Sequence, residues 1–195
     1  ADFSTILSVT NDGFVSETGV VLIDDLLSGG GMQSMMWTVS LILCALTFGG
    51  ILETTGMLNA IAQSILKLAV NTGLLVTATI LSCFTVNLIT GEQYLSIVIP
   101  GRMFKDAYAD RGLAPVNLSR ALEDSGTITS PLIPWNTCGA FMTATLGISP
   151  LAYAPYAFLN IINPFVSIFY GFTGITMIKM TEEEKAAYAA SKLHA

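Results

Sequence analysis

Long apolar stretches without charge alternate along this chain with short charged ones. Residues 35–53 are apolar and carry no charge before Glu53, which is enough for one membrane-spanning helix. From Ser125 to Ile178 the chain contains no Asp, Glu, Lys or Arg, which leaves room for two spans of about 20 residues each. The pattern predicts an all-α integral membrane protein.

The two ends of the chain are less apolar. Residues 1–34 are predicted to form an extracytoplasmic loop or linker, with a short helix over residues 20–27. Residues 179–195 are predicted to form a cytoplasmic tail. Within this tail, residues 181–184 read TEEE, which has the form of a capping box and predicts a short exposed helix that ends at Leu193.

Residues 56–70 show a different pattern, with one apolar and one polar side. Apolar residues recur at helical spacing at Leu58, Ile61, Ile65 and Leu68, and polar residues follow the opposite side at Asn59, Gln63 and Lys67. A helix with one polar face is expected to lie along the membrane interface rather than cross the membrane.

Residues 72–108 contain two apolar arms around a polar junction, Thr90-Gly91-Glu92. Arms of about 15 residues are short for full crossings. Irregular backbone at membrane depth is tolerated where it lines a cavity or is buried in protein, so we predict a re-entrant helical hairpin that turns at this junction. The alternative is two ordinary helices joined by a short external loop, with Glu92 in water.

Residues 116–147 are predicted to form a discontinuous transmembrane helix. Residues 125–131 read SGTITSP, and this Gly, Pro, Ser and Thr chemistry favours turns over helix. We expect the helix to stop near Asp124, to open for several residues and to restart near Pro134. A final span is predicted over residues 151–178, and Pro155 and Pro164 are expected to kink it.

The break in this helix suggests a site for a small cation. A helix C-terminus carries partial negative charge, so Asp124 is unfavourable there unless a cation or a proton joins it. Broken helices mark ion and substrate sites in secondary transporters. Glu92 is the second candidate carboxylate for Na⁺. The candidate neutral oxygen donors are Asn87, Thr90, Ser125, Thr127, Thr129 and Asn136. The alternative is an ordinary helix end, with Glu123 and Asp124 paired to Arg120.

Composition supports a membrane protein and argues against other classes. Charged residues make up 11% of the chain, against roughly 25% in a soluble domain. The net charge of −6 comes without a basic patch, so no nucleic-acid partner is expected. His194 is the one histidine and the three cysteines lie far apart, so neither an enzymatic site nor a cofactor is expected. The chain starts at Ala1 with no recognisable signal peptide, and we expect it to be a fragment of a longer protein.

The basic residues predict an orientation in the membrane. If the hairpin enters and leaves on one face, all eight Lys and Arg residues lie on the same side. The positive-inside rule makes that side, and with it the C-terminus, cytoplasmic. The acidic segment 1–34 then lies on the other side.

Several motifs resemble the NhaC family of Na⁺/H⁺ antiporters. Residues 123–140, which read EDSGTITSPLIPWNTCGA, resemble its signature. Four shorter stretches are also similar: residues 30–32, 46–53, 87–94 and 170–174. Members of this family are about twice as long, so the chain is similar to a C-terminal half. The resemblance implies one inverted-repeat half of a secondary transporter, with ions near the membrane midplane.

Residue chemistry and resemblance together predict a multi-pass antiporter that exchanges Na⁺ for H⁺ across the bacterial cytoplasmic (inner) membrane. Asp124 or Glu92 would bind either cation, and desolvation would bring the two into competition near neutral pH. The alternative is a Na⁺- or H⁺-coupled organic acid or amino acid exchanger of the same family. The expected partners are the lipid bilayer, Na⁺, H⁺ and the missing N-terminal half; the sequence leaves open whether the protein forms a homodimer.

Overall fold

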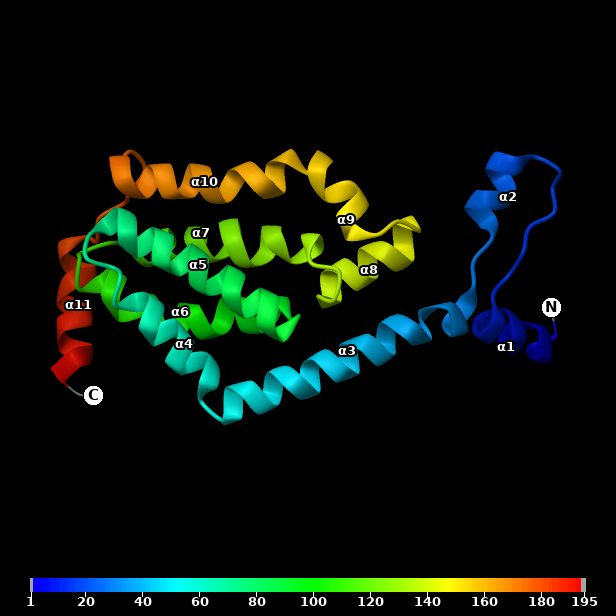
Figure 1. Cartoon of the computed structure of the whole chain (residues 1–195), viewed down its shortest axis with the longest axis horizontal. Coiled ribbons are helices and arrows are strands. Elements are labelled where there is room, and N and C mark those ends of the chain that lie inside the picture. Colours follow the sequence, from blue (N-terminus) through cyan, green and yellow to red (C-terminus); the bar gives the residue numbers. More distant parts are fainter. Residues whose placement is uncertain (1, 194–195) are drawn as a thin grey trace. The chain divides into compact units, whose positions relative to one another are not determined.

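All regular secondary structure in the described part of the chain is helical (Figure 1). The computed structural model describes residues 2–193, where the β-structure is limited to isolated bridges. In chain order the helices are α1 (Phe3–Asp12), α2 (Val21–Leu27), α3 (Gly31–Thr54), α4 (Met57–Leu66), α5 (Thr72–Thr90), α6 (Gln93–Ala109), α7 (Pro115–Leu122), the π-helix η1 (Glu123–Thr127), the 3₁₀-helix η2 (Ser130–Leu132), α8 (Thr137–Leu146), α9 (Pro150–Tyr153), the 3₁₀-helix η3 (Ala154–Tyr156), α10 (Phe158–Thr173) and α11 (Glu182–Leu193).

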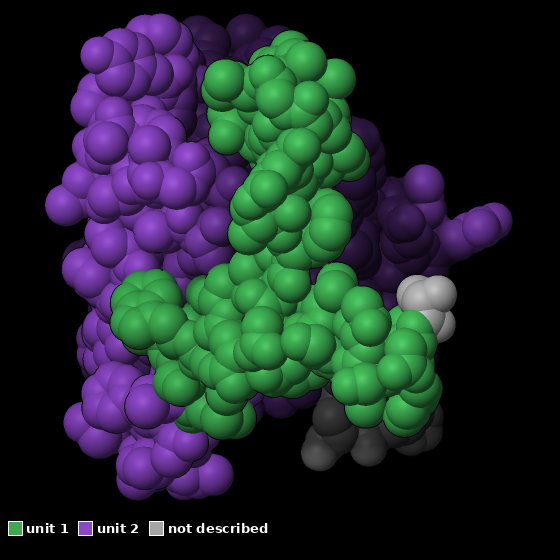
Figure 2. All heavy atoms as spheres, turned by 90° about the vertical axis from the view of Figure 1, so that its right-hand side faces the viewer, with its two compact units in different colours: residues 1–43 green, residues 44–195 purple. Residues whose placement is uncertain are grey.

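The chain divides into two compact units, residues 1–43 and 44–195, which Figure 2 colours green and purple. The boundary falls inside α3. The first unit holds α1, α2 and the start of α3. A bridge between Phe14 and Gly29 closes the loop that connects α1 to the start of α3.

Helix α1 is absent from the sequence prediction, which expected a loop with one short helix. Its Ser and Thr side chains have low helix propensity because they compete for backbone hydrogen bonds. In the structure, Thr10 nevertheless lies within the helix, and its Oγ1 donates to the Ile6 carbonyl at 2.8 Å. The predicted short helix over residues 20–27 is present as α2.

Two helices in the described residues are long and apolar enough to cross a membrane, α3 and α5. The bent pair Pro150–Tyr156 and Phe158–Thr173 would make a third. These helices support a membrane protein. Helix α5 is longer than the arm of about 15 residues expected from the sequence.

The core of the second unit forms around α5. This helix packs against α4, α6, α7 and α10. Its apolar positions are buried on several sides, as expected of a helix that lies inside a bundle. The main buried cluster joins Leu75 and Val76 of α5 to Phe104 and Tyr108 of α6.

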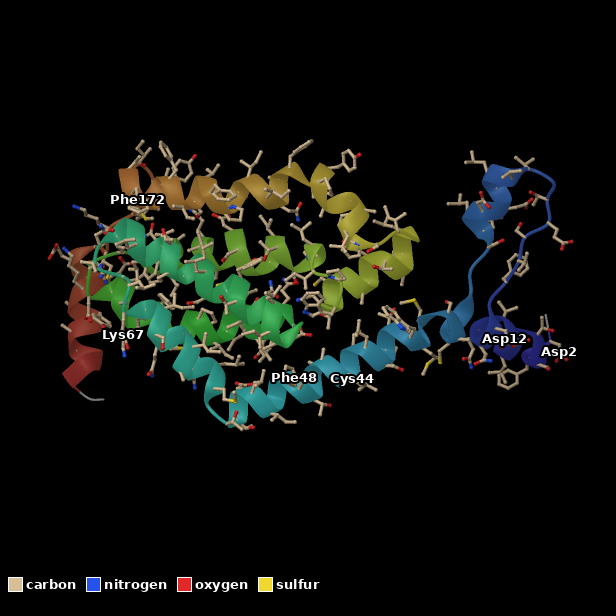
Figure 3. The ribbon with its side chains drawn as sticks, in the orientation of Figure 1. Asp2, Asp12, Cys44, Phe48, Lys67 and Phe172 are labelled. Atoms are coloured by element: carbon tan, nitrogen blue, oxygen red, sulfur yellow. The ribbon has the colours of Figure 1, made fainter. Side chains whose placement is uncertain are left out.

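Helix α10 approaches α5 closely through two glycines. A Cβ atom on Gly171 would lie 2.9 Å from Val76 Cβ, and a Cβ atom on Gly73 would lie 2.4 Å from the Phe172 ring. Phe172 lies near the C-terminal end of α10 (Figure 3). Gly171 therefore limits how near the two helices can lie, because Val76 Cβ is fixed to the backbone of α5, whereas the Phe172 ring opposite Gly73 belongs to a side chain that can turn.

The kink expected near Pro155 is present in the predicted final span over residues 151–178, where the chain breaks between η3 and α10. Helices α9 and η3 form a short first part that is bent by 60° from α10. The break follows Pro155, whose ring cannot continue the helical hydrogen bonding. Pro164 was also expected to kink the span, yet α10 runs through it to Thr173.

The C-terminal tail begins with the predicted capping box, which the structure confirms. The Thr181 N–H donates to Glu184 Oε2 at 2.8 Å, and the Glu184 N–H donates to Thr181 Oγ1 at 3.3 Å. Helix α11 is mostly exposed, as expected, but it also contacts α6 because Tyr188 Oη donates to Asp106 and Asp110.

Candidate cation site

The turn between α5 and α6 consists of Gly91 and Glu92. Gly91 has φ +64°, in the left-handed region that favours glycine. A Cβ atom there would lie 2.9 Å from the Trp135 carbonyl oxygen. Two further contacts hold the turn: the Trp135 Nε1–H donates to the Leu88 carbonyl at 2.8 Å, and the Thr137 N–H donates to the Gly91 carbonyl at 2.9 Å. The tip of the helical hairpin is thus fastened to the segment before α8.

The segment between α7 and α8 changes helix type before it opens. The sequence predicted that the helix stops near Asp124 and restarts near Pro134. The structure corrects both positions: the chain stays helical through the π-turn η1 and the 3₁₀-turn η2, and α8 starts at Thr137. Ile133 is the first extended residue, and Asn136 is the extended N-cap of α8.

Side chains from neighbouring helices occupy carbonyls that this irregular segment would otherwise leave free. Asn87 Nδ2 of α5 donates to the Gly126 carbonyl at 2.7 Å. Asn160 Nδ2 of α10 donates to the Ile128 carbonyl at 2.7 Å. The Tyr153 hydroxyl donates to the Pro131 carbonyl. The residues that predicted an open turn therefore form a helical segment whose carbonyls are bonded by polar side chains of other helices. Because these carbonyls have partners, the break comes later than predicted.

Asn87 and Asn136 join the hairpin to the start of α8 through a buried chain of hydrogen bonds. Asn136 Nδ2 donates to Asn87 Oδ1 at 2.9 Å, and both residues have 0% exposure. Asn136 Oδ1 in turn accepts from Ser130 Oγ at 3.0 Å and from the Cys138 N–H at 2.9 Å. Asn87 Nδ2 also lies 3.4 Å from Thr129 Oγ1. The structure thus brings together the predicted residues Asn87, Thr129 and Asn136.

The Asp124 carboxylate lies in η1 and faces α10. Asn163 Nδ2 donates to Asp124 Oδ1 at 2.8 Å, and Ser167 Oγ donates to Asp124 Oδ2 at 2.8 Å. Asp124 and Asn163 are half-buried, and Ser167 is buried. Each carboxylate oxygen therefore accepts one hydrogen bond from a neutral side chain of α10.

Sequence reasoning missed Asn163 and Ser167. A signal for them does exist, because Asn160, Asn163, Ser167 and Gly171 recur at spacings of three and four residues in an otherwise apolar helix. That spacing places polar and small residues on one helix face. The pattern alone did not indicate that Asp124 would be the partner of this face.

The other predicted hydroxyls bond within their own segment. Ser125 Oγ donates to the Ala121 carbonyl at 2.6 Å, and Thr129 Oγ1 donates to the Ser125 carbonyl at 2.5 Å. Thr127 Oγ1 donates to the Glu123 carboxylate. Each hydroxyl oxygen keeps acceptor capacity while it donates.

The second predicted carboxylate, Glu92, lies at the hairpin tip. It is half-buried, and its Oε1 accepts from the Tyr94 N–H at 3.3 Å as the N-cap of α6. Thr90 Oγ1 donates to the Val86 carbonyl at 2.8 Å and accepts from the Glu92 N–H at 3.2 Å. In the part of the chain that the structure describes, no hydrogen bond joins Glu92 to Asp124.

The alternative of a plain ion-paired helix end does not match the geometry. Arg120 Nη1 donates to Thr176 Oγ1 at 2.8 Å rather than to a carboxylate. Among the described residues, neither Glu123 nor Asp124 forms an ion pair with Arg120. Asp124 therefore sits in a polar setting in which no cationic side chain of the described residues is bonded to it.

Comparison with known proteins identifies the family to which these features belong. The sequence profile of the Na⁺/H⁺ antiporter family matches residues 1–175. The chain belongs to this family. This confirms the resemblance found in the sequence motifs.

The relatives of this family member are described as antiporters. The Na⁺/H⁺ antiporter NhaC of Alkalihalophilus pseudofirmus is 43% identical over 90% of this chain and 38% of its own length. The arginine/ornithine antiporter ArcD of Halobacterium salinarum is 39% identical over 96% of this chain and 39% of its own length. The NhaC of Bacillus subtilis is 41% identical over 88% of this chain and 38% of its own length. The chain thus spans less than two-fifths of these relatives. No solved structure matches it significantly.

Proposed function

We propose that the full-length protein exchanges Na⁺ for H⁺, and that Asp124 binds either cation in turn. The observation that carries this proposal is the setting of Asp124, whose two oxygens accept hydrogen bonds, among residues 2–193, from the neutral donors Asn163 and Ser167 only. A half-buried carboxylate without a bonded cationic partner is costly, and a bound Na⁺ or proton removes that cost. Membership of the Na⁺/H⁺ antiporter family supports these two cations.

The other candidate residues differ in how readily they could bind a cation. Glu92 would be a second carboxylate for Na⁺ at the hairpin tip. Neutral oxygens would come from Asn87, Thr90, Ser125, Thr127, Thr129 and Asn136. Asn136 Oδ1 already accepts two hydrogen bonds, so it would have to give one up to ligate a cation. Thr127 and Ser125 lie in the same π-turn as Asp124 and need no such exchange.

The proposed membrane arrangement is a re-entrant hairpin of α5 and α6 beside a discontinuous helix of α7, η1, η2 and α8. The length of α5 alone would suffice for a crossing, so support comes instead from the hairpin tip. Thr90 and Gly91 are buried, and the Gly91 carbonyl accepts a hydrogen bond from the Thr137 N–H at the start of α8. Buried irregular backbone of this kind marks sites in transporters.

We further propose that the protein lies in the bacterial inner membrane with its C-terminus in the cytoplasm. The apolar helices and the family support a membrane protein, and the distribution of Lys and Arg supports the orientation. The proposed partners are the lipid bilayer, Na⁺, H⁺ and an N-terminal half that supplies the other repeat; a homodimer remains an alternative.

Proton flux in everted membrane vesicles that contain the full-length protein tests the function. A dye that reports ΔpH should show that NaCl collapses the gradient and that KCl or organic acids do not. Asp124→Asn should abolish this response while the protein stays inserted in the membrane, because the amide can bind neither cation as a carboxylate does. Normal Na⁺-dependent exchange by Asp124→Asn would remove Asp124 from the site.

A Na⁺- or H⁺-coupled amino acid or organic acid exchanger is the second candidate. One relative is described as an arginine/ornithine antiporter, and it is 39% identical. A cavity of about 360 Å³ beside the start of α8 has a mostly apolar lining that includes Pro131, Phe141 and Met142, with Gln93, Thr127, Thr137 and Cys138 among its polar residues. A ΔpH response to an organic acid or a basic amino acid, without a response to Na⁺, would favour this function.

A further inference from the structure

We propose that the cavity between α6, α7 and α11 binds a phospholipid whose headgroup carries both a phosphate and an ammonium group. The cavity has a volume of about 500 Å³, and its described lining contains none of the residues proposed as cation ligands. Its occupancy therefore does not depend on which ions the protein exchanges. Helix α11, which the sequence predicted only as an exposed helix, becomes one wall of a binding site.

Two antiparallel segments that pack closely supply the first two walls. A Cβ atom on Gly101 of α6 would lie 3.2 Å from Leu122 Cδ1 of α7, and a Cβ atom on Gly126 of η1 would lie 3.0 Å from Ile97 Cγ1. Ligand sites of this volume are lined mainly by apolar side chains with a few polar groups, and this lining fits that description. Its apolar residues include Ile97, Ala109, Leu113, Leu118, Leu122 and Met180.

Helix α11 supplies the third wall, at the end of the second unit where α6 ends and α7 begins (Figure 1). Two sets of contacts hold it there. The Met180 N–H donates to the Gly112 carbonyl at 2.8 Å. Tyr188 Oη donates to Asp106 at 3.3 Å and to Asp110 at 3.2 Å. The cavity is thus formed before a ligand enters, as is usual for small-molecule sites.

The cavity spans the change from apolar to charged sequence along α6. Residues 94–101 carry no charge, whereas residues 102–111 contain five charged side chains. Ile97 and Lys105 both line the cavity and lie about 12 Å apart along the helix axis. On the proposed orientation, this is the level at which the hydrocarbon core meets the cytoplasmic headgroups. A lipid of that leaflet would meet apolar walls at one end and charged side chains at the other.

Two opposite charges line the cavity without pairing with each other. Among the described residues, the Lys105 ammonium forms neither an ion pair nor a hydrogen bond. Glu184 Oε2 accepts from the Thr181 N–H at 2.8 Å, and Glu184 Oε1 keeps acceptor capacity. The other carboxylate of the lining, Glu123, already accepts from the Thr127 hydroxyl. Lys105 and Glu184 can therefore each bind a group of the opposite sign.

Lys105 and Glu184 also belong to the same end of the cavity. Glu184 lies one turn before Tyr188, so the two side chains share a face of α11. Tyr188 bonds to Asp106, which follows Lys105 in α6. A phosphate matches Lys105, because lysine binds phosphate as a point charge, and an ammonium group matches Glu184. A headgroup that contains both groups satisfies both side chains at once.

The lining favours this class of lipid over three other ligands. An anionic lipid without an ammonium group would bring negative charge to a lining that holds two carboxylates and one ammonium. A trimethylated ammonium group has no N–H to donate to Glu184. A soluble phosphate ester without acyl chains would leave the apolar walls in contact with water. Phosphatidylethanolamine has the acyl chains, the phosphate and the N–H donors, and it is the probe for this site.

The test follows the thermal unfolding midpoint of the full-length protein in detergent while lipid is added, because a ligand of the folded state raises that midpoint. Phosphatidylethanolamine should act at lower concentration than phosphatidylglycerol, phosphatidylcholine or soluble ethanolamine phosphate. Lys105→Met keeps an apolar stem without the charge, and Glu184→Gln keeps the acceptor of the capping box without the charge. Each variant should raise the half-maximal concentration of phosphatidylethanolamine by about tenfold.

Two exposed residues outside the described lining provide matched controls. Arg102→Met removes a positive charge from α6, and Glu183→Gln removes a negative charge from the first turn of α11. Both variants should keep the half-maximal concentration of the unaltered protein. A tenfold rise in the controls as well would overturn the site, because the effect would then come from general surface charge.

The remaining outcomes also decide the question. Unchanged half-maximal concentrations in Lys105→Met and Glu184→Gln would show that this lipid does not occupy the cavity, for instance because the N-terminal half covers it. Equal potency of phosphatidylglycerol would contradict the role of Glu184. Equal potency of soluble ethanolamine phosphate would contradict binding through the apolar walls. Asp124→Asn is not part of this comparison, so the lipid site and the antiport function stand or fall separately.

Discussion

Gly91 is the residue on which the turn between α5 and α6 depends most directly. Its φ of +64° and the approach of the Trp135 carbonyl to 2.9 Å from an added Cβ both select glycine. Gly91→Ala should therefore destabilise the protein by more than about 1 kcal/mol. The thermal unfolding midpoint of the full-length protein in detergent measures this effect.

Gly50 offers the matched control for that substitution. It lies inside α3, and a Cβ atom there would meet no atom within 4 Å. Gly50→Ala should be neutral or stabilising by about 0.5–1 kcal/mol, because alanine is the better helix former. If both variants unfold at the same temperature, the turn does not need its left-handed residue.

Asn87 is expected to stabilise the folded protein, whether or not it also binds a cation. Asn87→Ala would leave the Gly126 carbonyl and Asn136 Nδ2 buried without their partner. Each such group costs about 1–3 kcal/mol, so a large fall in the unfolding midpoint is expected. Asn59→Ala, at an exposed position of α4, is the control and should change little. Equal midpoints would show that the buried chain of amides is dispensable.

Asp24 in the first unit should show a pH response at acid pH. Hydrogen bonds from the Thr18 backbone N–H, then from the Thr18 hydroxyl, lower the pKa of this exposed carboxyl below its ordinary value. A depressed folded-state pKa means that the stabilising effect is complete above the unfolded value of about 3.9 and is lost as pH falls through the lower folded value. An NMR titration of the Gly19 amide, which donates to Asp24 Oδ2, follows this transition. A midpoint at the ordinary value would contradict these contacts.

At the scale of whole helices, the packing of α10 against α5 gives the clearest prediction. Gly171→Ala would place a Cβ 2.9 Å from Val76 Cβ, an atom fixed to the backbone of α5. The helices must then move apart at a cost of about 1–3 kcal/mol. Gly171→Ala should therefore lower the thermal unfolding midpoint of the full-length protein in detergent.

Gly73→Ala tests whether that effect is specific to Gly171. Its Cβ would meet the ring of Phe172, whose side chain is 57% exposed and can rotate away. This variant should keep its thermal unfolding midpoint. If Gly73→Ala lowers the midpoint as much as Gly171→Ala does, the close approach at Val76 is not what limits the distance between the two helices.

The apolar pattern predicted which segments are helical better than it predicted which segments contact one another. The uncharged residues of α3 and the TEEE capping box were sufficient to predict those helices, because both signals are local. Helix α1 was missed because its Ser and Thr residues disfavour helix on their own. The break after α7 was placed too early, since Asn87 and Asn160, distant in sequence, hold the Gly126 and Ile128 carbonyls.

The same difference between local signals and distant contacts applies to the candidate site. Asp124 was predicted as a candidate because a carboxylate beside turn chemistry is unusual in an apolar run, and this signal is local in the sequence. Asn163 and Ser167 were not found because their role depends on a contact across 39 and 43 residues of sequence. Such contacts are decided by helix packing, here by the approach of α10 to α5, and the spacing within α10 only hints at them.

For the protein as a whole, the arrangement of charges predicts which ends of the chain share a side of the membrane. Segment 1–34 contains no Lys or Arg, whereas Lys185 and its neighbours follow the last apolar helix. With the hairpin entering and leaving on one face, the two ends lie on opposite sides. Two full crossings in place of the hairpin would preserve this parity, and a single interrupted crossing would reverse it.

Cysteine labelling of the full-length protein tests that parity. In a background in which Cys44, Cys83 and Cys138 are replaced by Ser, Glu17→Cys and Lys185→Cys each provide one thiol at an exposed position. A membrane-impermeant maleimide should label Glu17→Cys in right-side-out vesicles and Lys185→Cys in everted ones. Labelling of both from the same side would mean that the α5–α6 pair crosses once in total. In that case α5 and α6 would not form a re-entrant hairpin that enters and leaves on the cytoplasmic face. Glu92 could then not lie at the tip of such a hairpin.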